Sequence, residues 1–151
     1  MYSKEESKKL RIEFWNTFGS LSKKKRKKQP WVLYNTKVKN LSLKFVAEQK
    51  YCSVVMDIEY RSDNKRHRFY ENMLSLQTLF NSKFDNKLIW DKDFYIDGEK
   101  EVSRIHIDLQ NVSIYKKEDW PTIFEFLFEN MTKLENTFLE YKDIIKEFVE
   151  N

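Results

Sequence analysis

The chain predicts an α+β fold: an antiparallel sheet of about five strands with helices packed on it, in the order α-β-β-β-α-β-β-α, within one domain spanning residues 1–151. Apolar residues follow helical spacing at both ends and in the middle of the chain, and they alternate with polar residues in between. The strands come in runs of three and two without β-α-β alternation, which favours antiparallel pairing. An unbroken apolar repeat predicts a long C-terminal helix.

The first helix is predicted to begin after Ser3, because Ser3 and Glu6 have the spacing of a capping box. Phe14 and Phe18 continue the helical spacing up to Gly19, a residue type that commonly ends helices. We therefore expect residues 20–30 to form a polar loop. This loop contains the one low-complexity run of the chain, six consecutive cations: Lys23, Lys24, Lys25, Arg26, Lys27 and Lys28.

Strands are predicted at 31–34, 41–47 and 51–60, where β-forming residues are dense or alternate with polar ones. Ser62 is then placed to cap a helix of about 20 residues. Its expected buried stripe contains Phe69, Met73, Leu76 and Phe80. Two further strands are predicted at about 87–96 and 102–110, of which the second turns Arg104, His106 and Asp108 away from the core.

The C-terminal helix is predicted to span residues 119–150 and to be about 45 Å long. Strands of six residues cover only about 20 Å of it. We therefore expect Trp120–Leu134 to be core and Phe138–Val149 to lack a full partner within the chain, with the first helix covering part of it. Tyr141, Ile145 and Phe148 are expected either at a contact with another α-helix or at the twofold interface of a homodimer.

Composition excludes several classes of protein. Two Gly residues leave no room for a glycine-rich phosphate loop, and Cys52 is alone, so neither a disulfide framework nor a cysteine zinc site is expected. No apolar stretch is long enough to span a membrane, and the N-terminus does not resemble a signal peptide, so we expect a cytoplasmic protein with no membrane association. Residues 1–50 carry 14 Lys and Arg against 4 acids, whereas the remainder carries 14 against 20. The basic end suits a polyanion.

Six segments of the chain, in this order, resemble DUF4268, a bacterial domain of unknown function: Tyr2–Glu6, Leu10–Trp15, Leu33–Lys37, Phe45–Ala47, Met56–Glu59 and Glu118–Pro121. Members of this family occur alone and also attached to nuclease-like domains. The resemblance therefore implies an association with nucleic acid or phage defence. It provides no catalytic residues to transfer.

Two arrangements bear on an enzyme. Glu48-Gln49-Lys50 has the spacing of the second element of a magnesium-dependent nuclease core, but no Asp precedes Asp57, so the upstream ligand is missing. The second arrangement is a sheet face bearing Asp57, Glu59, His106 and Asp108, where His106 is a candidate base or metal ligand. The alternative is that this face carries only cross-strand salt links. We therefore expect no enzyme, no cofactor and no metal.

The basic run Lys23–Lys28 is the main candidate site. Six cations on a loop contact phosphates without reading bases, which predicts nonspecific binding of DNA or RNA with a log–log salt slope of about −5. Trp31 and Tyr34 are candidate stacking surfaces unless they belong to the core. The alternative for the run is an ordinary solvated loop.

The sequence thus predicts a noncatalytic nucleic-acid-binding module. The alternative is a homodimeric protein-interaction or chaperone-like domain that pairs through its C-terminal helix, since the order of elements resembles that of type III secretion chaperones.

Overall fold

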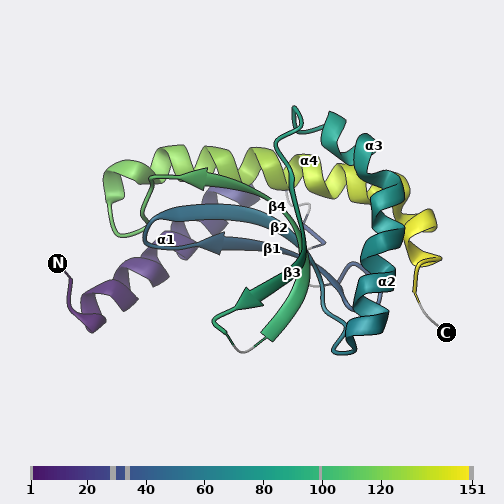
Figure 1. Cartoon of the computed structure of the whole chain (residues 1–151). Helices are drawn as coiled ribbons and strands as arrows, with labels where there is room; N and C mark the ends of the chain where they lie inside the picture. The colour runs from purple at the N-terminus through teal and green to yellow at the C-terminus, as the bar shows by residue number, and fades with distance from the viewer. Residues whose placement is uncertain (1, 28–29, 33–34, 99, 150–151) are drawn as a thin grey trace.

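The chain has the predicted α+β architecture with a long C-terminal helix (Figure 1). The computed structural model describes residues 2–27, 30–32, 35–98 and 100–149. The strands form one antiparallel sheet in the order β1-β2-β4-β3. They are β1 (Leu41–Ala47), β2 (Tyr51–Ile58), β3 (Ile89–Ile96) and β4 (Lys100–Gln110). The α-helices are α1 (Lys4–Lys25), α2 (Asp63–Met73), α3 (Gln77–Ser82) and α4 (Trp120–Lys146).

The sheet of the described residues has four strands, so the prediction of about five was too high. The expected strand at 31–34 falls partly on Leu33 and Tyr34, which lie outside the described residues. Trp31 belongs to no strand. Its ring packs 6.0 Å from that of Phe18 and 5.2 Å from that of Phe45, between centroids, so its apolar character contributes to the core.

Helix α1 begins as predicted but does not end at Gly19. The Ser3 hydroxyl accepts from the backbone N–H of Glu6, and the Glu6 carboxylate accepts from the backbone N–H of Ser3. The expected loop at 20–30 was wrong, because the helix continues to Lys25. A glycine inside a helix costs only about 1 kcal/mol relative to alanine. The buried side chains of Phe18 and Ser22, one turn apart, hold the helix across Gly19.

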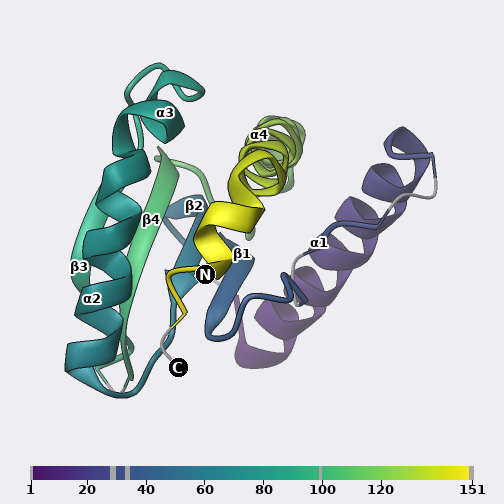
Figure 2. The same ribbon diagram turned by 90° about the vertical axis from the view of Figure 1, so that its right-hand side faces the viewer.

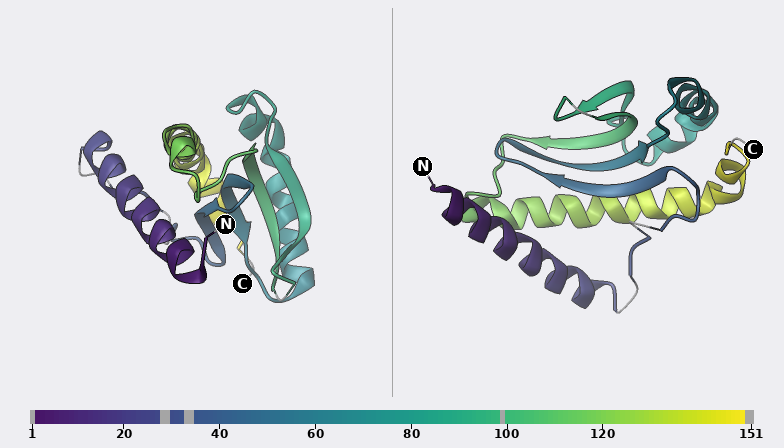
Figure 3. Two further views of the ribbon diagram at one scale, coloured as in Figure 1. Left: turned by 90° about the vertical axis from the view of Figure 1, so that its left-hand side faces the viewer. Right: turned by 90° about the horizontal axis from the view of Figure 1, so that it is seen from below.

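Helix α4 lies between α1 on one side and α2 with β3 on the other (Figures 2 and 3). Most of the predicted core of its first half is buried, since Trp120, Ile123, Leu127, Met131 and Leu134 are at most 6% exposed, whereas Phe124 is only half-buried. Helix α1 meets this half, with the Phe14 ring packing 5.0 Å from the Phe124 ring between centroids. None of the described helices is both long and apolar enough to cross a membrane.

The second half of α4 was expected to lack a full partner within the chain, and this was wrong. Ile145 is fully buried, Tyr141 lies 6.1 Å from Phe80 of α3, and Phe148 lies 5.9 Å from Phe69 of α2, between ring centroids. The predicted contact with another helix is therefore present, but α2 and α3 provide it in place of α1. These helices extend the core beyond the ends of the strands (Figure 1).

The predicted helix begins directly after Ser62, its N-cap, whose hydroxyl accepts from the backbone N–H of Lys65 at 3.4 Å. A 3-10 turn, Leu74–Leu76, divides it into α2 and α3. The predicted stripe is nevertheless buried throughout, because the turn keeps all four of its residues directed toward α4 and the sheet: Phe69, Met73, Leu76 and Phe80.

Candidate functional site

Charged side chains gather on the face of the sheet opposite α4, as the alternation of β2 and β4 predicted. The antiparallel register sets Asp57 opposite Arg104. Nε and Nη2 of Arg104 donate to the two carboxylate oxygens of Asp57, at 2.8 and 3.0 Å. Asp57 is fully buried, and Arg104 is 6% exposed. A bidentate pair of this kind is among the stronger side-chain interactions and fixes both groups.

Glu59 lies beside this pair and is neutralised by cations from two strands. Lys44 Nζ lies 2.7 Å from Glu59 Oε2 and 3.5 Å from the Asp57 carboxylate. The Ser42 hydroxyl also donates to Glu59, and Lys100 Nζ donates at 3.2 Å. Burial raises the pKa of Glu59, but the hydrogen bonds from Lys44 and Ser42 outweigh it, so the pKa of this carboxyl lies below its ordinary value.

His106 bridges two carboxylates. Its Nδ1 lies 2.8 Å from Asp108 Oδ1, and its Nε2 lies 2.7 Å from Asp91 Oδ2. Burial lowers the pKa of His106, but the hydrogen bonds to Asp108 and Asp91 raise it more, so its pKa lies above the ordinary value of 6.5. Because both ring nitrogens are engaged by carboxylates, neither is free to hold a metal ion or to accept a proton from a substrate. The arrangement supports the cross-strand salt links rather than a catalytic base.

Two residues that bury this face were missed from the sequence. The Phe94 ring lies 4.1 Å from Arg104 Cζ and packs edge-on against His106. Asp91 supplies the second carboxylate. Plain alternation sets Asp91 and Phe94 on opposite faces, but an irregularity in the register between them returns both to the same face.

The other residues considered for catalysis or metal binding do not form a site among the described residues. Glu48 and Lys50 lie exposed in the turn between β1 and β2, and Glu48 pairs with Arg11 at 3.8 Å. Cys52 is a core residue, as predicted, because it is fully buried and burial raises the pKa of its thiol to about 12. Among the residues that the structure describes, no group of three or more His, Cys, Asp or Glu is arranged to hold a metal ion.

The basic run is divided by the end of α1. Lys23, Lys24 and Lys25 form the last turn of the helix, Arg26 is its C-cap, and Lys27 follows with a φ of 50°. Lys28 lies outside the described residues. Cations in this turn complement the partial negative charge at a helix C-terminus. Among the described residues, the exposed side chains of Lys23, Lys24 and Lys27 form no ion pair.

Arg26 makes structural contacts within the domain. Its Nη2 donates to Glu135 of α4 at 2.9 Å and to the carbonyl oxygen of Pro30 at 3.1 Å, and its guanidinium lies 4.4 Å from the Trp31 ring. Trp31 is therefore stacked between Arg26 and Phe18 and is not a free platform. The other stacking candidate, Tyr34, lies outside the described residues.

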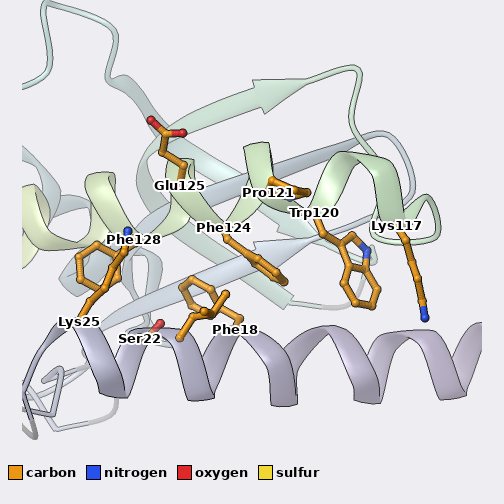
Figure 4. A pocket seen from close by; sticks show the side chains of 10 residues that line it. Phe18, Ser22, Lys25, Lys117, Trp120, Pro121, Phe124, Glu125 and Phe128 are labelled. Atoms are coloured by element: carbon orange, nitrogen blue, oxygen red, sulfur yellow. The ribbon is translucent and has the colours of Figure 1, made fainter.

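A groove of about 630 Å³ begins next to the basic run and follows the contact between α1 and α4 (Figure 4). The two helices diverge from the beginning of α4 toward the end of α1 (Figure 3). Lys25 and Lys117 stand at its two ends (Figure 4). Its walls are mainly apolar, with the aromatic residues Phe18, Trp120, Phe124 and Phe128 among the lining residues.

The match to a protein family covers most of both helices of this groove and the whole sheet. A family model described as a domain of unknown function (DUF4268) matches residues 10–142. The chain belongs to the DUF4268 family. The region matched in this DUF4268 domain runs from within α1 to near the end of α4, so it contains the basic run and the charged residues on the sheet face opposite α4. No curated protein and no solved structure matches the chain.

Proposed function

We propose that this DUF4268 domain is a noncatalytic module that binds nucleic acid, with the C-terminal end of α1 as its phosphate-binding surface. The observation that carries the proposal is the cluster of exposed cations Lys23, Lys24 and Lys27, which stand together at one tip of the molecule beside the cationic Lys25. Phosphate contacts by such side chains position a nucleic acid without reading its sequence.

The different contacts of Arg26 and of the lysines in the basic run support this surface. Arg26 and Glu135 neutralise each other at 2.9 Å and anchor the segment to α4. The end of α1 holds the neighbouring lysines close to one another, and they take no part in the pair between Arg26 and Glu135. An anchored group of exposed cations loses less side-chain and backbone freedom on binding than a flexible loop would.

The noncatalytic part of the proposal rests on the hydrogen bonding and burial of the charged residues on the sheet face opposite α4. Asp57, Arg104 and His106 are hydrogen-bonded to one another or to neighbouring carboxylates, and they are nearly inaccessible. We expect nuclease assays with Mg²⁺ or Mn²⁺ to remain at background, and Glu48→Ala to leave the fold and the binding unchanged. Turnover that disappears in Glu48→Ala would overturn this part.

The direct test is retention on a DNA column with a salt gradient. The wild-type protein is expected to be retained at low salt, and the triple variant Lys23→Gln, Lys24→Gln, Lys27→Gln is expected to elute much earlier. A matched control removes three lysines outside the basic run, one just before β3 and two in the last turns of α4: Lys87→Gln, Lys142→Gln and Lys146→Gln. It has the same net charge as the triple variant, so equal elution of the two variants would show a charge effect without a site.

A further inference from the structure

The groove between α1 and α4 contains features that the fold does not use. Ser22 lines it and is 4% exposed, yet its hydroxyl has no hydrogen-bond partner among the described residues. Buried polar side chains are nearly always paired, so an unpaired hydroxyl in the wall of an open groove indicates a partner that comes from outside. The size of the groove is within the range of ligand-binding pockets.

Phe124 is the aromatic ring best placed to meet a ligand. It is half-buried, and Phe14 and Phe18 of α1 brace it at 5.0 and 5.6 Å between ring centroids. Trp120 supports it from the preceding turn of α4 at 5.9 Å. The ring is directed into the space between the helices (Figure 4). A braced aromatic ring that faces an open groove is the feature on which unpaired bases stack in proteins that bind single strands.

The charges around the groove favour an anionic occupant. Lys25 Nζ lies over the Phe128 ring at 5.0 Å, at the end that adjoins the exposed lysines. At the other end Lys117 pairs with Glu13 at 2.8 Å, so its charge is already partly balanced. The acid among the described lining residues, Glu125, points away from α1 (Figure 4). Attraction for phosphate is therefore concentrated at the Lys25 end.

We propose that this groove binds single-stranded nucleic acid, with a base stacked on Phe124, phosphates on Lys25 and its exposed neighbours, and the Ser22 hydroxyl bonded to a base edge or to the backbone. This rests on the proposed function and adds a ligand class, since the stacked bases of a duplex are not available to a ring recessed between two helices. A purely electrostatic surface binds single strands and duplexes through phosphate alone.

The test compares three labelled ligands by fluorescence anisotropy: a single strand, the duplex of the same sequence, and an abasic strand of the same length. The wild-type protein is expected to bind the single strand about tenfold more tightly than the abasic strand. Phe124→Leu keeps an apolar side chain in the core but removes the ring, and it is expected to abolish that difference while leaving binding of the duplex and the abasic strand unchanged. Phe126→Leu, on the same helix but outside the groove, is the matched control and is expected to behave as wild type.

Ser22→Ala keeps the proposal testable if Phe124→Leu does not fold. It removes a buried hydroxyl that lacks a partner, so the variant is expected to be at least as stable as wild type and to bind the single strand about threefold more weakly. Equal wild-type affinity for the single strand and the abasic strand overturns the groove proposal and leaves the phosphate surface standing. Failure to bind any of the three ligands overturns both.

Discussion

The guanidinium of Arg104 forms two hydrogen bonds with the fully buried carboxylate of Asp57, across the β2–β4 pair and on the sheet face opposite the helices. Lys44 approaches the same carboxylate at 3.5 Å, and Phe94 covers the guanidinium. A buried pair with this many partners is costly to break, because removal of one group leaves the other charged and desolvated.

Arg104→Met is expected to lower the free energy of unfolding by about 3–5 kcal/mol. Urea denaturation measures this directly. Lys92→Met, in the neighbouring strand, removes a cation from an exposed pair with Glu71 and is the matched control. Its unfolding midpoint is expected to remain near that of wild type. Equal midpoints for the two variants would contradict a structural role for the Asp57–Arg104 pair.

The stability of the domain is expected to depend on pH through His106. Its pKa is raised above 6.5 in the folded protein, because Asp108 and Asp91 stabilise the charged ring more than burial disfavours it. The folded state therefore holds this proton more tightly than the unfolded state. The resulting stabilisation is fully present below pH 6.5 and is lost as the pH rises through the folded pKa.

Thermal unfolding of wild type and His106→Gln between about pH 5 and pH 9 measures this contribution. The difference in Tm between the two proteins is expected to be largest at the acidic end and to shrink as the pH rises. A difference that grows toward alkaline pH would mean that His106 is neutral in the folded protein. Below this range the opposite sign applies to Asp108, whose pKa is lowered, so its contribution is lost as the pH falls.

Arg26 and Lys24 are neighbours in the basic run with different expected roles. Arg26→Gln leaves the buried carboxylate of Glu135 without its cation and is expected to cost about 2–3 kcal/mol of folding stability. Lys24→Gln is expected to change stability by less than about 0.5 kcal/mol, because its side chain is exposed. Chemical denaturation of both variants distinguishes the anchor from the binding surface, and equal stabilities would contradict this division.

Two adjacent residues of α4 test the homodimer alternative. Ile145 is fully buried against the rest of its own chain, so Ile145→Asp is expected to destabilise the fold by at least about 3 kcal/mol. Ile144 is 45% exposed, and Ile144→Asp is expected to leave a folded species of 18.6 kDa in light scattering. A wild-type species of twice that mass, reduced to 18.6 kDa by Ile144→Asp, would establish a dimer through the outer face of α4.

The local signals in the sequence predicted most of the fold. The alternation at 41–47 located β1 at the residues where it lies, and the Ser3–Glu6 capping box located the beginning of α1. Two features depend on tertiary contacts that no local pattern contains. Helix α1 continues past Gly19 because Phe18 and Ser22 on either side of it are buried, and the end of α4 is covered by α2 and α3 of the same chain.

The candidate site was predictable in part. Alternation brought Asp57, Arg104 and His106 to one face, but the bulge in β3 that adds Asp91 and Phe94 reverses the simple alternation. The basic run was visible in the sequence, whereas the role of Arg26 depends on Glu135, more than a hundred residues away. The groove is formed by two helices from opposite ends of the chain, so no local motif in the sequence predicts it.

Salt dependence of binding to a labelled duplex is the most direct test of the phosphate surface. With contacts from Lys23, Lys24, Lys25 and Lys27, the plot of log affinity against log salt is expected to have a slope of about −3.6. The variant lacking Lys23, Lys24 and Lys27 is expected to have a slope of about −0.9, and the control lacking Lys87, Lys142 and Lys146 a slope near that of wild type. A wild-type slope near zero, or the same slope in all three proteins, would contradict nucleic-acid binding through the end of α1.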